Sequence, residues 1–336
     1  MPLSFRHPSP LRPVYPITPD DVAAARTRIA PFMPASPVRT YPLLDAWVGH
    51  GIRVSVKHEN FNPTGSFKVR NGLSFMTALP PAERARGVVA ATRGNHGLGI
   101  AFAGRALGVP ATICVPHGNN PDKNAGIRAL GATLIEEGTD YDASIQAAAR
   151  VQRETGAALA HSTNDAKVLA GAATLSFEFL EAAPDLDAMV IAIGGGSQAV
   201  GALVAATVLR PSLAVHGVQA AGAPATHVSW HAREMRTTER AETFADGLAT
   251  RSAYALTFPA LLHGLAGFVT VTEAEIADAL RALLSTTHTL VEGAAAAALA
   301  GMKQLAPTLA GQHVGLIISG GNIDEATLKR VLLREI

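Results

Sequence analysis

The residue with the clearest chemical potential is Lys68, in the stretch Asn62-Pro-Thr-Gly-Ser-Phe-Lys-Val-Arg70. An alternating strand over 52–56 precedes this stretch, and the pattern after it predicts a helix over 67–76, so Lys68 stands at the mouth of a helix. A lysine held near apolar walls can lose its proton and become an amine nucleophile, as a Schiff base with a carbonyl cofactor requires. Most lysines at a helix start are solvated, so other stretches must decide whether Lys68 does chemistry.

A glycine-rich turn, Ala192-Ile-Gly-Gly-Gly-Ser-Gln-Ala-Val-Gly201, offers an anion site. It follows a predicted strand and opens a predicted helix, so unhindered backbone N–H groups and the helix dipole converge where a phosphate could sit. The same turn satisfies the loose dinucleotide pattern Gly-x-Gly-x-x-Ala. That pattern also needs an acidic residue about twenty positions on, and the segment 216–221 reads His-Gly-Val-Gln-Ala-Ala, without a carboxylate. Nicotinamide binding therefore fits the sequence poorly.

Three further stretches complete a pattern: Ala91-Thr-Arg-Gly-Asn-His-Gly97, Ala245-Asp-Gly247 and Ser319-Gly-Gly-Asn322. Together with the lysine stretch from Glu59 and the glycine turn, their order and spacing resemble the pyridoxal-phosphate-dependent serine/threonine dehydratase (threonine ammonia-lyase) family, which has the tryptophan synthase β-like fold, fold type II. The resemblance runs from about Ile17 to the end of the chain. It implies an α/β fold of two domains and pyridoxal 5′-phosphate as the cofactor.

The resemblance implies a role for each matching residue. Lys68 is the catalytic residue, which would hold the cofactor as a Schiff base and remove the α-proton of the substrate. The implied cofactor-binding residues are Phe67, Lys68, Asn95, Gly194, Gly195, Gly196, Ser197, Gln198, Gly247, Glu292 and Ser319. The implied substrate-binding residues are Ser66, Thr92, Arg93, Gly94, Asn95 and His96. Ser197 replaces the fourth glycine of the usual loop, and Glu292-Gly293 replaces the usual Glu-Pro.

Ser319 indicates which reaction the cofactor would support. The resemblance places its hydroxyl against the pyridine nitrogen, where a carboxylate would keep the ring protonated but a hydroxyl leaves it largely neutral. A neutral ring favours prompt loss of a β-leaving group over a long-lived carbanion, so elimination is favoured over transamination. The implied activity is an ammonia-lyase of a β-hydroxy-α-amino acid, threonine or serine by default, which yields a 2-oxo acid and ammonia. Without the other motifs, Ser-Gly-Gly would be read as a turn.

Arg93 departs from the family, in which many members have Ser or Ala at this position. In serine racemase that Ser is the acid/base on the second face of the substrate, so Arg93 argues against racemisation as the main activity. Its guanidinium either meets a polar group of a less usual substrate, with 3-phenylserine and 3-hydroxyaspartate as open choices, or points to solvent or supports the loop. A β-replacement synthase, a racemase of the same fold and a non-catalytic cofactor binder stay as alternatives.

No metal site is predicted. Relatives with a divalent-metal site carry an acidic ligand near the position of Ala221. His227 and His231 have the i, i+4 spacing of a zinc pair, but no Glu directly follows the first histidine and no third ligand is evident. His161 matches a family position at the hinge side of the small domain and is expected to be structural.

The elements that must position these residues alternate along the chain. Thr18-Pro-Asp-Asp21 predicts a capped helix that runs to about Ala30. Short apolar strands are predicted at 88–91, 111–115, 133–135, 189–193, 215–219 and 314–318, with Ala-rich helical segments between them. Such strands are typical of parallel sheets covered on both faces, so the sequence predicts the α/β class. The resemblance adds a large cofactor-binding domain, 1–79 and 167–336, and a small mobile domain, 80–166.

Composition narrows the setting of the protein. The 336 residues are 48% hydrophobic and carry a net charge of +1 without basic runs, so a small-molecule substrate is favoured over nucleic acid or a membrane. The proline-rich Met1–Pro16 is expected to be an extended arm and not a targeting segment. The single Cys114 excludes an intrachain disulfide and is expected to be a buried thiol, which fits the cytoplasm. The resemblance further implies a homodimer or homotetramer.

Overall fold

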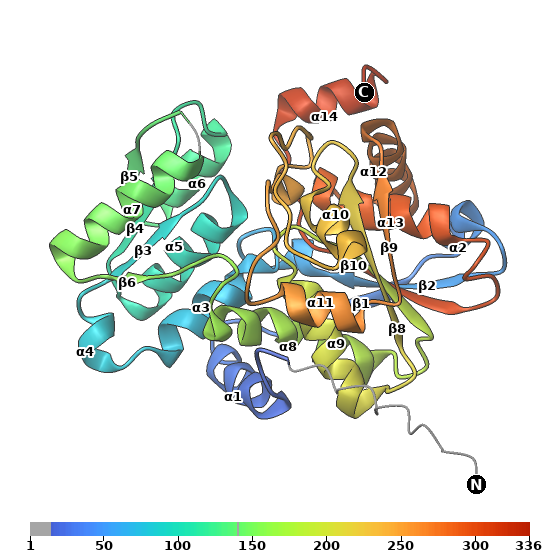
Figure 1. The fold of residues 1–336 in the computed structure, drawn as a ribbon, viewed down its shortest axis with the longest axis horizontal. Helices are drawn as coiled ribbons and strands as arrows, with labels where there is room; N and C mark the ends of the chain where they lie inside the picture. Colours follow the sequence, from blue (N-terminus) through green and yellow to red (C-terminus); the bar gives the residue numbers. More distant parts are fainter. Residues whose placement is uncertain (1–14, 140) are drawn as a thin grey trace, which may run out of the picture.

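The structure is a computed structural model that describes residues 15–139 and 141–336. Most of the predicted arm, Met1–Pro16, therefore lies outside the described residues. Strands and helices alternate along the chain, and the predicted α/β class is confirmed (Figure 1). The helices are α1 (Pro19–Ile29), α2 (Pro42–Val48), α3 (Lys68–Ala78), α4 (Pro81–Arg84), α5 (Asn95–Leu107), α6 (Pro121–Ala129), α7 (Tyr141–Thr155), α8 (Ala166–Ala182), α9 (Ser197–Leu209), α10 (Ala225–Ala232), α11 (Phe258–Gly264), α12 (Glu273–Thr287), α13 (Gly293–Leu305) and α14 (Glu325–Leu332), with the 3₁₀ turns η1 (Glu59–Phe61) and η2 (Asp246–Leu248).

The strands form two sheets, and among the described strands every pairing is parallel except that of the first two. The six-stranded sheet has the order β1 (Val38–Thr40), β2 (Arg53–His58), β10 (His313–Ile318), β7 (Ala188–Ala192), β8 (Ala214–Ala220) and β9 (Gly267–Val271). The four-stranded sheet has the order β5 (Thr133–Glu136), β4 (Ala111–Val115), β3 (Val88–Ala91) and β6 (Ala158–Leu159). Helices cover both sheets, as the predicted continuous apolar strands require (Figure 1).

Local sequence signals agree well with the elements. The α1 helix begins where predicted, because the Thr18 side chain accepts a hydrogen bond from the Asp21 N–H and the Asp21 carboxylate accepts one from the Thr18 N–H. All the predicted strands form, with bounds that shift by two residues at most. Two predictions are corrected, one on the ends of a helix and one on the edge strands of the sheets. The α3 helix begins at Lys68 and continues to Ala78, and β1, β6 and β9 were not predicted because they are short or only partly buried edge strands.

The four strands of the smaller sheet all lie between residues 88 and 159. That span falls inside the predicted small domain, 80–166, but the boundary itself stays a prediction. Core packing crosses it, since Leu73 and Met76 of α3 belong to the same hydrophobic cluster as Ile100 and Ile113. The later turns of α3 therefore pack into the core of the four-stranded sheet, and Figure 1 shows this helix between the two sheets.

Two glycines let α3 and α5 cross in direct backbone contact. A Cβ atom at Gly72 would lie 2.2 Å from the Gly99 carbonyl oxygen, and one at Gly99 would lie 2.3 Å from the Lys68 carbonyl oxygen. No side chain other than hydrogen fits at either position. This crossing brings the first turn of α3, which carries Lys68, beside the first turn of α5, which carries Asn95.

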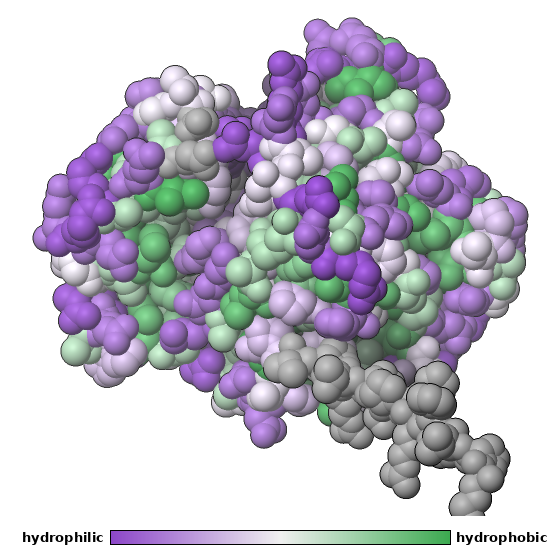
Figure 2. Space-filling view, in the orientation of Figure 1, coloured by the Kyte–Doolittle hydropathy of each residue, from purple (hydrophilic) through white to green (hydrophobic). Residues whose placement is uncertain are grey.

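The surface and the single thiol agree with an ordinary globular chain. On the face shown in Figure 2, hydrophilic side chains spread over both halves of the molecule, with hydrophobic ones scattered among them. Among the described residues, no helix combines the length and apolar character needed to cross a bilayer. Cys114 is buried and unpaired, as predicted.

Candidate active site

A cavity of about 730 Å³ lies at the carboxyl ends of parallel strands from both sheets. Ligands of open α/β sheets bind at this edge, because the loops that follow the strands converge there. The cavity gathers predicted residues from six separate stretches of the chain. Those that line it are Phe67, Lys68, Thr92, Arg93, Gly94, Asn95, His96, Gly194, Gly195, Gly196, Ser197, Gln198, Gly247, Glu292 and Ser319.

Lys68 presents an amine of lowered basicity to this cavity. Burial lowers the pKa of Lys68 to about 8, and the Glu292 carboxylate opposes part of that decrease. Its Nζ donates to the Ser162 carbonyl oxygen at 3.3 Å and lies 4.9 Å from the centroid of the Phe67 ring. More of the Lys68 amine is therefore unprotonated near neutral pH than at the ordinary lysine pKa of 10.5, as a nucleophile or a base requires.

The glycine turn forms a cradle in which side chains would collide. A Cβ atom would lie 2.3 Å from the Gly247 carbonyl oxygen if placed at Gly194, and 2.0 Å from the Thr163 hydroxyl if placed at Gly195. Gly196 has φ +90°, in the left-handed region that glycine tolerates. The α9 helix begins directly after it at Ser197. Bare backbone and a 13-residue helix opening onto the cavity suit a phosphate group.

A hydrogen-bonded chain fixes the side chain of Asn95. Its Nδ2 donates to both carboxylate oxygens of Glu292 at 2.9 Å, and its Oδ1 accepts from Asn322 Nδ2 at 2.8 Å. Glu292 is buried, and burial raises its pKa to about 7 although Lys123 acts in the opposite direction. Asn322 was noticed only as the end of the Ser-Gly-Gly-Asn stretch, yet it sets the orientation of Asn95.

The two predicted serines differ in their access to the cavity. Ser319 follows β10, lines the cavity and accepts the Phe67 N–H at its carbonyl oxygen, at 2.9 Å, which ties the lysine stretch to this sheet. Ser66 was expected to bind substrate, but it is fully buried and does not line the cavity. Its hydroxyl has no partner among the described residues, and its backbone pairs with Gly320 instead. The substrate-binding role of Ser66 therefore stays a prediction.

The turn at 92–96 precedes and opens α5. The Thr92 hydroxyl accepts the Gly94 N–H at 2.9 Å, so it shapes the turn from within. His96 is buried, and burial together with the nearby Lys68 lowers its pKa to about 3. Its ring is therefore neutral, with Nε2 2.9 Å from the Ala160 carbonyl oxygen as the donor. Arg93 carries an exposed side chain that lines this cavity and a second one beside it.

Several lining residues were not anticipated. Lys123 of α6 and Asp246 of η2 form an ion pair at the cavity wall. His161, expected to be structural, lines the cavity with its Nδ1 accepting the Thr163 and Asn164 N–H groups, and its ring meets the Tyr254 ring edge-on at 5.8 Å. Asp246 lay inside a quoted motif, but nothing near Lys123 in the sequence indicated a site.

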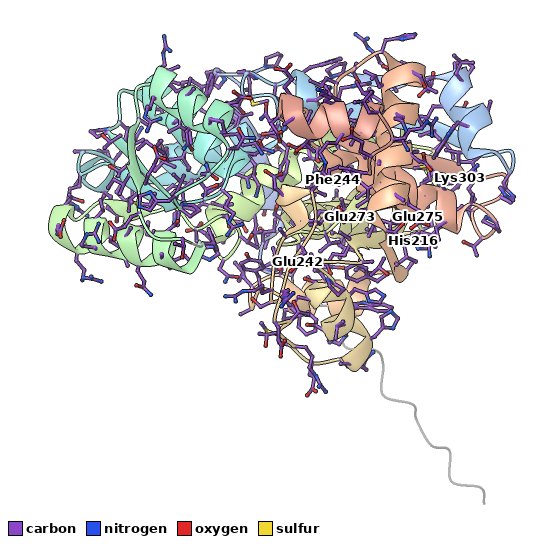
Figure 3. All side chains as sticks on the ribbon, turned by 90° about the horizontal axis from the view of Figure 1, so that it is seen from above. His216, Glu242, Phe244, Glu273, Glu275 and Lys303 are labelled. Carbon is purple, nitrogen blue, oxygen red and sulfur yellow. The ribbon has the colours of Figure 1, made fainter. Side chains whose placement is uncertain are left out.

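Residues of α12 and α13 hold the segment that carries Asp246 and Gly247. The Phe244 N–H donates to Glu273 Oε2 at 2.9 Å, and a Cβ atom at Gly293 would lie 2.8 Å from the Phe244 ring. Figure 3 shows both Phe244 and Glu273 in the half of the molecule that contains the six-stranded sheet. The wall near Gly247 is therefore held by the N-terminal ends of α12 and α13.

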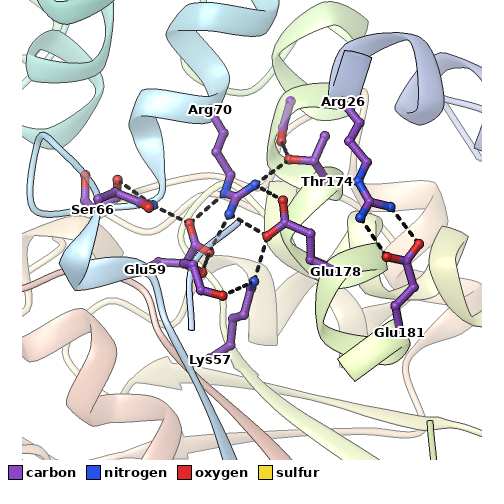
Figure 4. A network of polar contacts seen from close by, with 11 residues as sticks. Arg26, Lys57, Glu59, Ser66, Arg70, Thr174, Glu178 and Glu181 are labelled. Atoms are coloured by element: carbon purple, nitrogen blue, oxygen red, sulfur yellow. Dashed lines mark hydrogen bonds and ion pairs between the residues drawn. The ribbon is translucent and has the colours of Figure 1, made fainter. Parts of the chain in front are cut away.

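A buried ionic network supports the lysine stretch (Figure 4). The Arg70 guanidinium donates to Glu59 at 2.8 and 3.0 Å and to Glu178 at 2.7 and 2.8 Å. Lys57 Nζ donates to Glu178 at 2.6 Å, so two cations face two carboxylates. Ser36 donates to Glu59 at 2.5 Å, which satisfies one more acceptor. The network clamps the segment before Lys68 to the first turn of α3.

The two histidines with zinc-like spacing lie apart from this site. His227 and His231 stand on α10 with ring centroids 4.4 Å apart. Within residues 15–139 and 141–336, no group of three or more His, Cys, Asp or Glu side chains could hold a metal ion.

Comparison with known proteins places these residues in context. Residues 30–320 match the family model described as pyridoxal-phosphate dependent enzyme. The chain is 38% identical over 282 residues to an L-threonine ammonia-lyase of Thermotoga maritima, covering 84% of this chain and 70% of that protein. It is 33% identical over 304 residues to an L-threo-3-hydroxyaspartate ammonia-lyase of Pseudomonas sp, covering 90% and 95% of the two chains. The solved structure of maize serine racemase superposes with a TM-score of 0.90 at 29% identity, covering 96% of this chain and 98% of that one.

Proposed function

Since the chain belongs to the family of pyridoxal-phosphate dependent enzymes, we propose that it is an ammonia-lyase that converts a β-hydroxy-α-amino acid into a 2-oxo acid and ammonia. Relatives named as ammonia-lyases of threonine and of 3-hydroxyaspartate support this reaction class. The β-hydroxyl leaves as water, and one water is taken up when ammonia is released, so the atoms balance. The observation that carries the proposal is that the Lys68 amine, of lowered pKa, shares one cavity with the glycine cradle and Ser319.

The cavity fits the cofactor of this family, pyridoxal 5′-phosphate. The phosphate would lie in the cradle of 194–196, whose Cβ positions are blocked, with Ser197 and Gln198 at the start of α9 beside it. Ser319 would face the ring nitrogen, and Phe67 and Asn95 would border the ring. When bound, the cofactor supplies an electron sink for the charge that develops at the substrate α-carbon.

The residues of the chain would then bind the substrate and move its protons. Unprotonated Lys68 is the base proposed for the α-proton, since its pKa lies close to neutral pH. The turn over 92–96 opens α5, so its backbone N–H groups would hold the substrate carboxylate. Asn95, held between Glu292 and Asn322, would keep that turn in one orientation.

Threonine and serine are the default substrates of this proposal. Arg93 keeps 3-hydroxyaspartate open, because an exposed guanidinium at the cavity wall can pair with a second carboxylate. The larger 3-phenylserine stays open as well. A panel of these four amino acids, scored for 2-oxo acid with the purified enzyme, identifies the preferred substrate.

Racemisation and β-replacement are the competing activities. A racemase needs a second proton-transfer group on the opposite face of the substrate, and Arg93 replaces the Ser that has this role in serine racemase. A synthase would consume a second nucleophile such as sulfide. Release of 2-oxo acid and ammonia in equal amounts, with neither D-amino acid nor a sulfide adduct, distinguishes the ammonia-lyase from both.

The first test detects a covalent bond between Lys68 and the cofactor. Borohydride reduction of the loaded enzyme should leave a pyridoxyl group on the peptide that contains Lys68, detected by mass spectrometry. Lys68→Ala should lose this group, and turnover should fall by about 10²- to 10⁴-fold or more. Lys303→Ala, an exposed lysine on α13, should retain both. Full activity in Lys68→Ala would exclude the proposed mechanism.

We further propose a cytoplasmic homodimer or homotetramer. Two exposed apolar residues, Phe61 (46% exposed) and Leu290 (42% exposed), lie on segments that are joined by a hydrogen bond from Asn60 Nδ2 to the Leu290 carbonyl oxygen at 3.2 Å. Light scattering during gel filtration should give twice or four times the mass of one chain. A monomer at micromolar concentration would contradict this assembly, and cell fractionation tests the compartment.

A further inference from the structure

Lys123 is a buried lysine that connects the two halves of the molecule. It stands on α6, which packs against the four-stranded sheet, and its side chain is only 5% exposed. Its Nζ donates to Asp246 Oδ2 in η2, on the side of the six-stranded sheet. Burial lowers the pKa of Lys123, but Asp246, Glu292 and Asp324 outweigh that effect and raise it overall, so Lys123 stays charged. A charged lysine buried at the wall of a cavity needs a reason beyond solubility.

The same side chain supports the turn that would receive the substrate carboxylate. A Cβ atom at Gly94 would lie 3.0 Å from Lys123 Cδ and 3.1 Å from its Nζ. The lysine stem therefore packs directly against the backbone between Arg93 and Asn95. Movement of Lys123 would change the position of the N–H groups that open α5.

Lys123 also faces the carboxylate that orients Asn95. Glu292 raises the pKa of Lys123, and Lys123 lowers the pKa of Glu292, so the two charged groups attract each other. Four residues, Arg93, Lys123, Asp246 and Glu292, line both the 730 Å³ cavity and the neighbouring cavity of about 820 Å³. Among these four residues, Lys123 packs against the turn, bonds Asp246 on the side of the six-stranded sheet and interacts electrostatically with Glu292.

We propose that Lys123 is a positioning residue for substrate binding: its ammonium holds the 92–96 turn in place and ties it across the cavity to Asp246. This inference rests on the proposed function, because the turn matters only if it receives a carboxylate. Asp246 bonds Lys123 and acts on the charge of Glu292, whereas Lys123 bonds Asp246, acts on Glu292 and also packs against the turn. Loss of the lysine should therefore weaken substrate binding more than loss of its aspartate partner.

The test compares Lys123→Met, Asp246→Asn and the double variant with the loaded wild-type enzyme. Loss of a charged hydrogen bond of this kind corresponds to a rise in KM of about tenfold to a hundredfold in Lys123→Met. Asp246→Asn should raise KM less, and the double variant should match Lys123→Met. Lys123→Arg should recover part of the loss, since it keeps the charge.

The Kd for the cofactor should change less than about twofold in each variant, because the glycine cradle does not contact Lys123. Lys303→Met, whose lysine lies on α13 (Figure 3), is the matched control.

Amide hydrogen exchange of the cofactor-free protein gives a readout that is independent of turnover. Lys123→Met should speed exchange in both 92–97 and 244–248, whereas Asp246→Asn should affect mainly 244–248. Unchanged KM and unchanged exchange in Lys123→Met would overturn the inference, as would a larger effect of Asp246→Asn than of Lys123→Met. If the wild-type enzyme forms no 2-oxo acid, the proposed function fails, while the exchange data still decide whether Lys123 fixes the turn.

Discussion

Arg70 gives the sharpest test of how this site is supported. Its guanidinium is 1% exposed and bonds two carboxylates, Glu59 and Glu178, so Arg70→Met leaves two buried charges with only Lys57 to compensate them. Removal of one partner from a buried ionic network costs about 3–5 kcal/mol of unfolding free energy. For 336 residues the entropy of unfolding is roughly 0.7 kcal/mol/K, so the expected fall in Tm is about 4–7 °C.

An exposed ion pair nearby provides the matched control. Arg26 bonds Glu181 at 2.6 Å with both side chains 43% exposed, and Figure 4 shows this pair beside the buried network. Because exposed pairs contribute about 0–1 kcal/mol, Arg26→Met should lower Tm by roughly 1 °C or less. Thermal unfolding of the cofactor-free variants by circular dichroism measures both. Equal shifts in the two variants would refute the reasoning that burial sets the magnitude.

The pH dependence of this stability has a defined sign. Burial alone would raise the pKa of Glu178, but Arg70 and Lys57 lower it overall. A carboxylate with a lowered folded pKa contributes stability above its unfolded value, near 4.5, and loses that contribution as pH falls through the folded value. The Tm difference between wild type and Arg70→Met should therefore shrink in acid. A difference that grows below pH 4.5 would contradict this assignment.

Three further predictions concern the cavity and the thiol. Gly195→Ala places a methyl group 2.0 Å from the Thr163 hydroxyl, so the cradle must shift. The Kd for the cofactor, measured by absorbance titration, should therefore rise about tenfold or more. An unchanged Kd would show that the cradle does not bind the phosphate. The rate at which the cofactor-free enzyme attaches the cofactor should rise with pH through about 8, because only unprotonated Lys68 reacts. In Glu292→Gln that midpoint should move to lower pH, since the carboxylate that raises the pKa of Lys68 is gone, and an upward shift would contradict this. Burial raises the pKa of Cys114 to about 11, so thiol reagents should modify it only after denaturation, and rapid labelling of the native protein would contradict its burial.

The elements were predictable because their signals are local. The Thr18 cap depends on a partner three residues away, and the apolar runs of the buried strands identify themselves within a few residues. The short edge strands escaped prediction because their pairing, not their composition, makes them strands. The start of α3 was predicted within one residue, since the Gly-Ser turn before Phe67 ends the preceding extended segment.

The candidate site was predictable only through the order of several motifs. Lys68 alone favoured a solvated helix end over an amine nucleophile. The resemblance gathered the glycine turn, the 92–96 turn and Ser319 around it, and the same residues line one cavity. Ser66 was gathered by the same reasoning, but its side chain is buried and does not line the cavity, whereas its neighbour Phe67 does.

Residue order alone specifies the buried strands, the helix caps, the bare glycine turn after β7 and a lysine at the start of α3. Tertiary structure decides the charge states and the connections: the lowered pKa of Lys68, the clamp on Asn95 by Glu292, and the Lys123–Asp246 bridge between residues 123 positions apart. The physical reason is that caps and turns are made by neighbours in the chain, whereas burial and Coulomb interactions depend on groups that only the folded chain brings together.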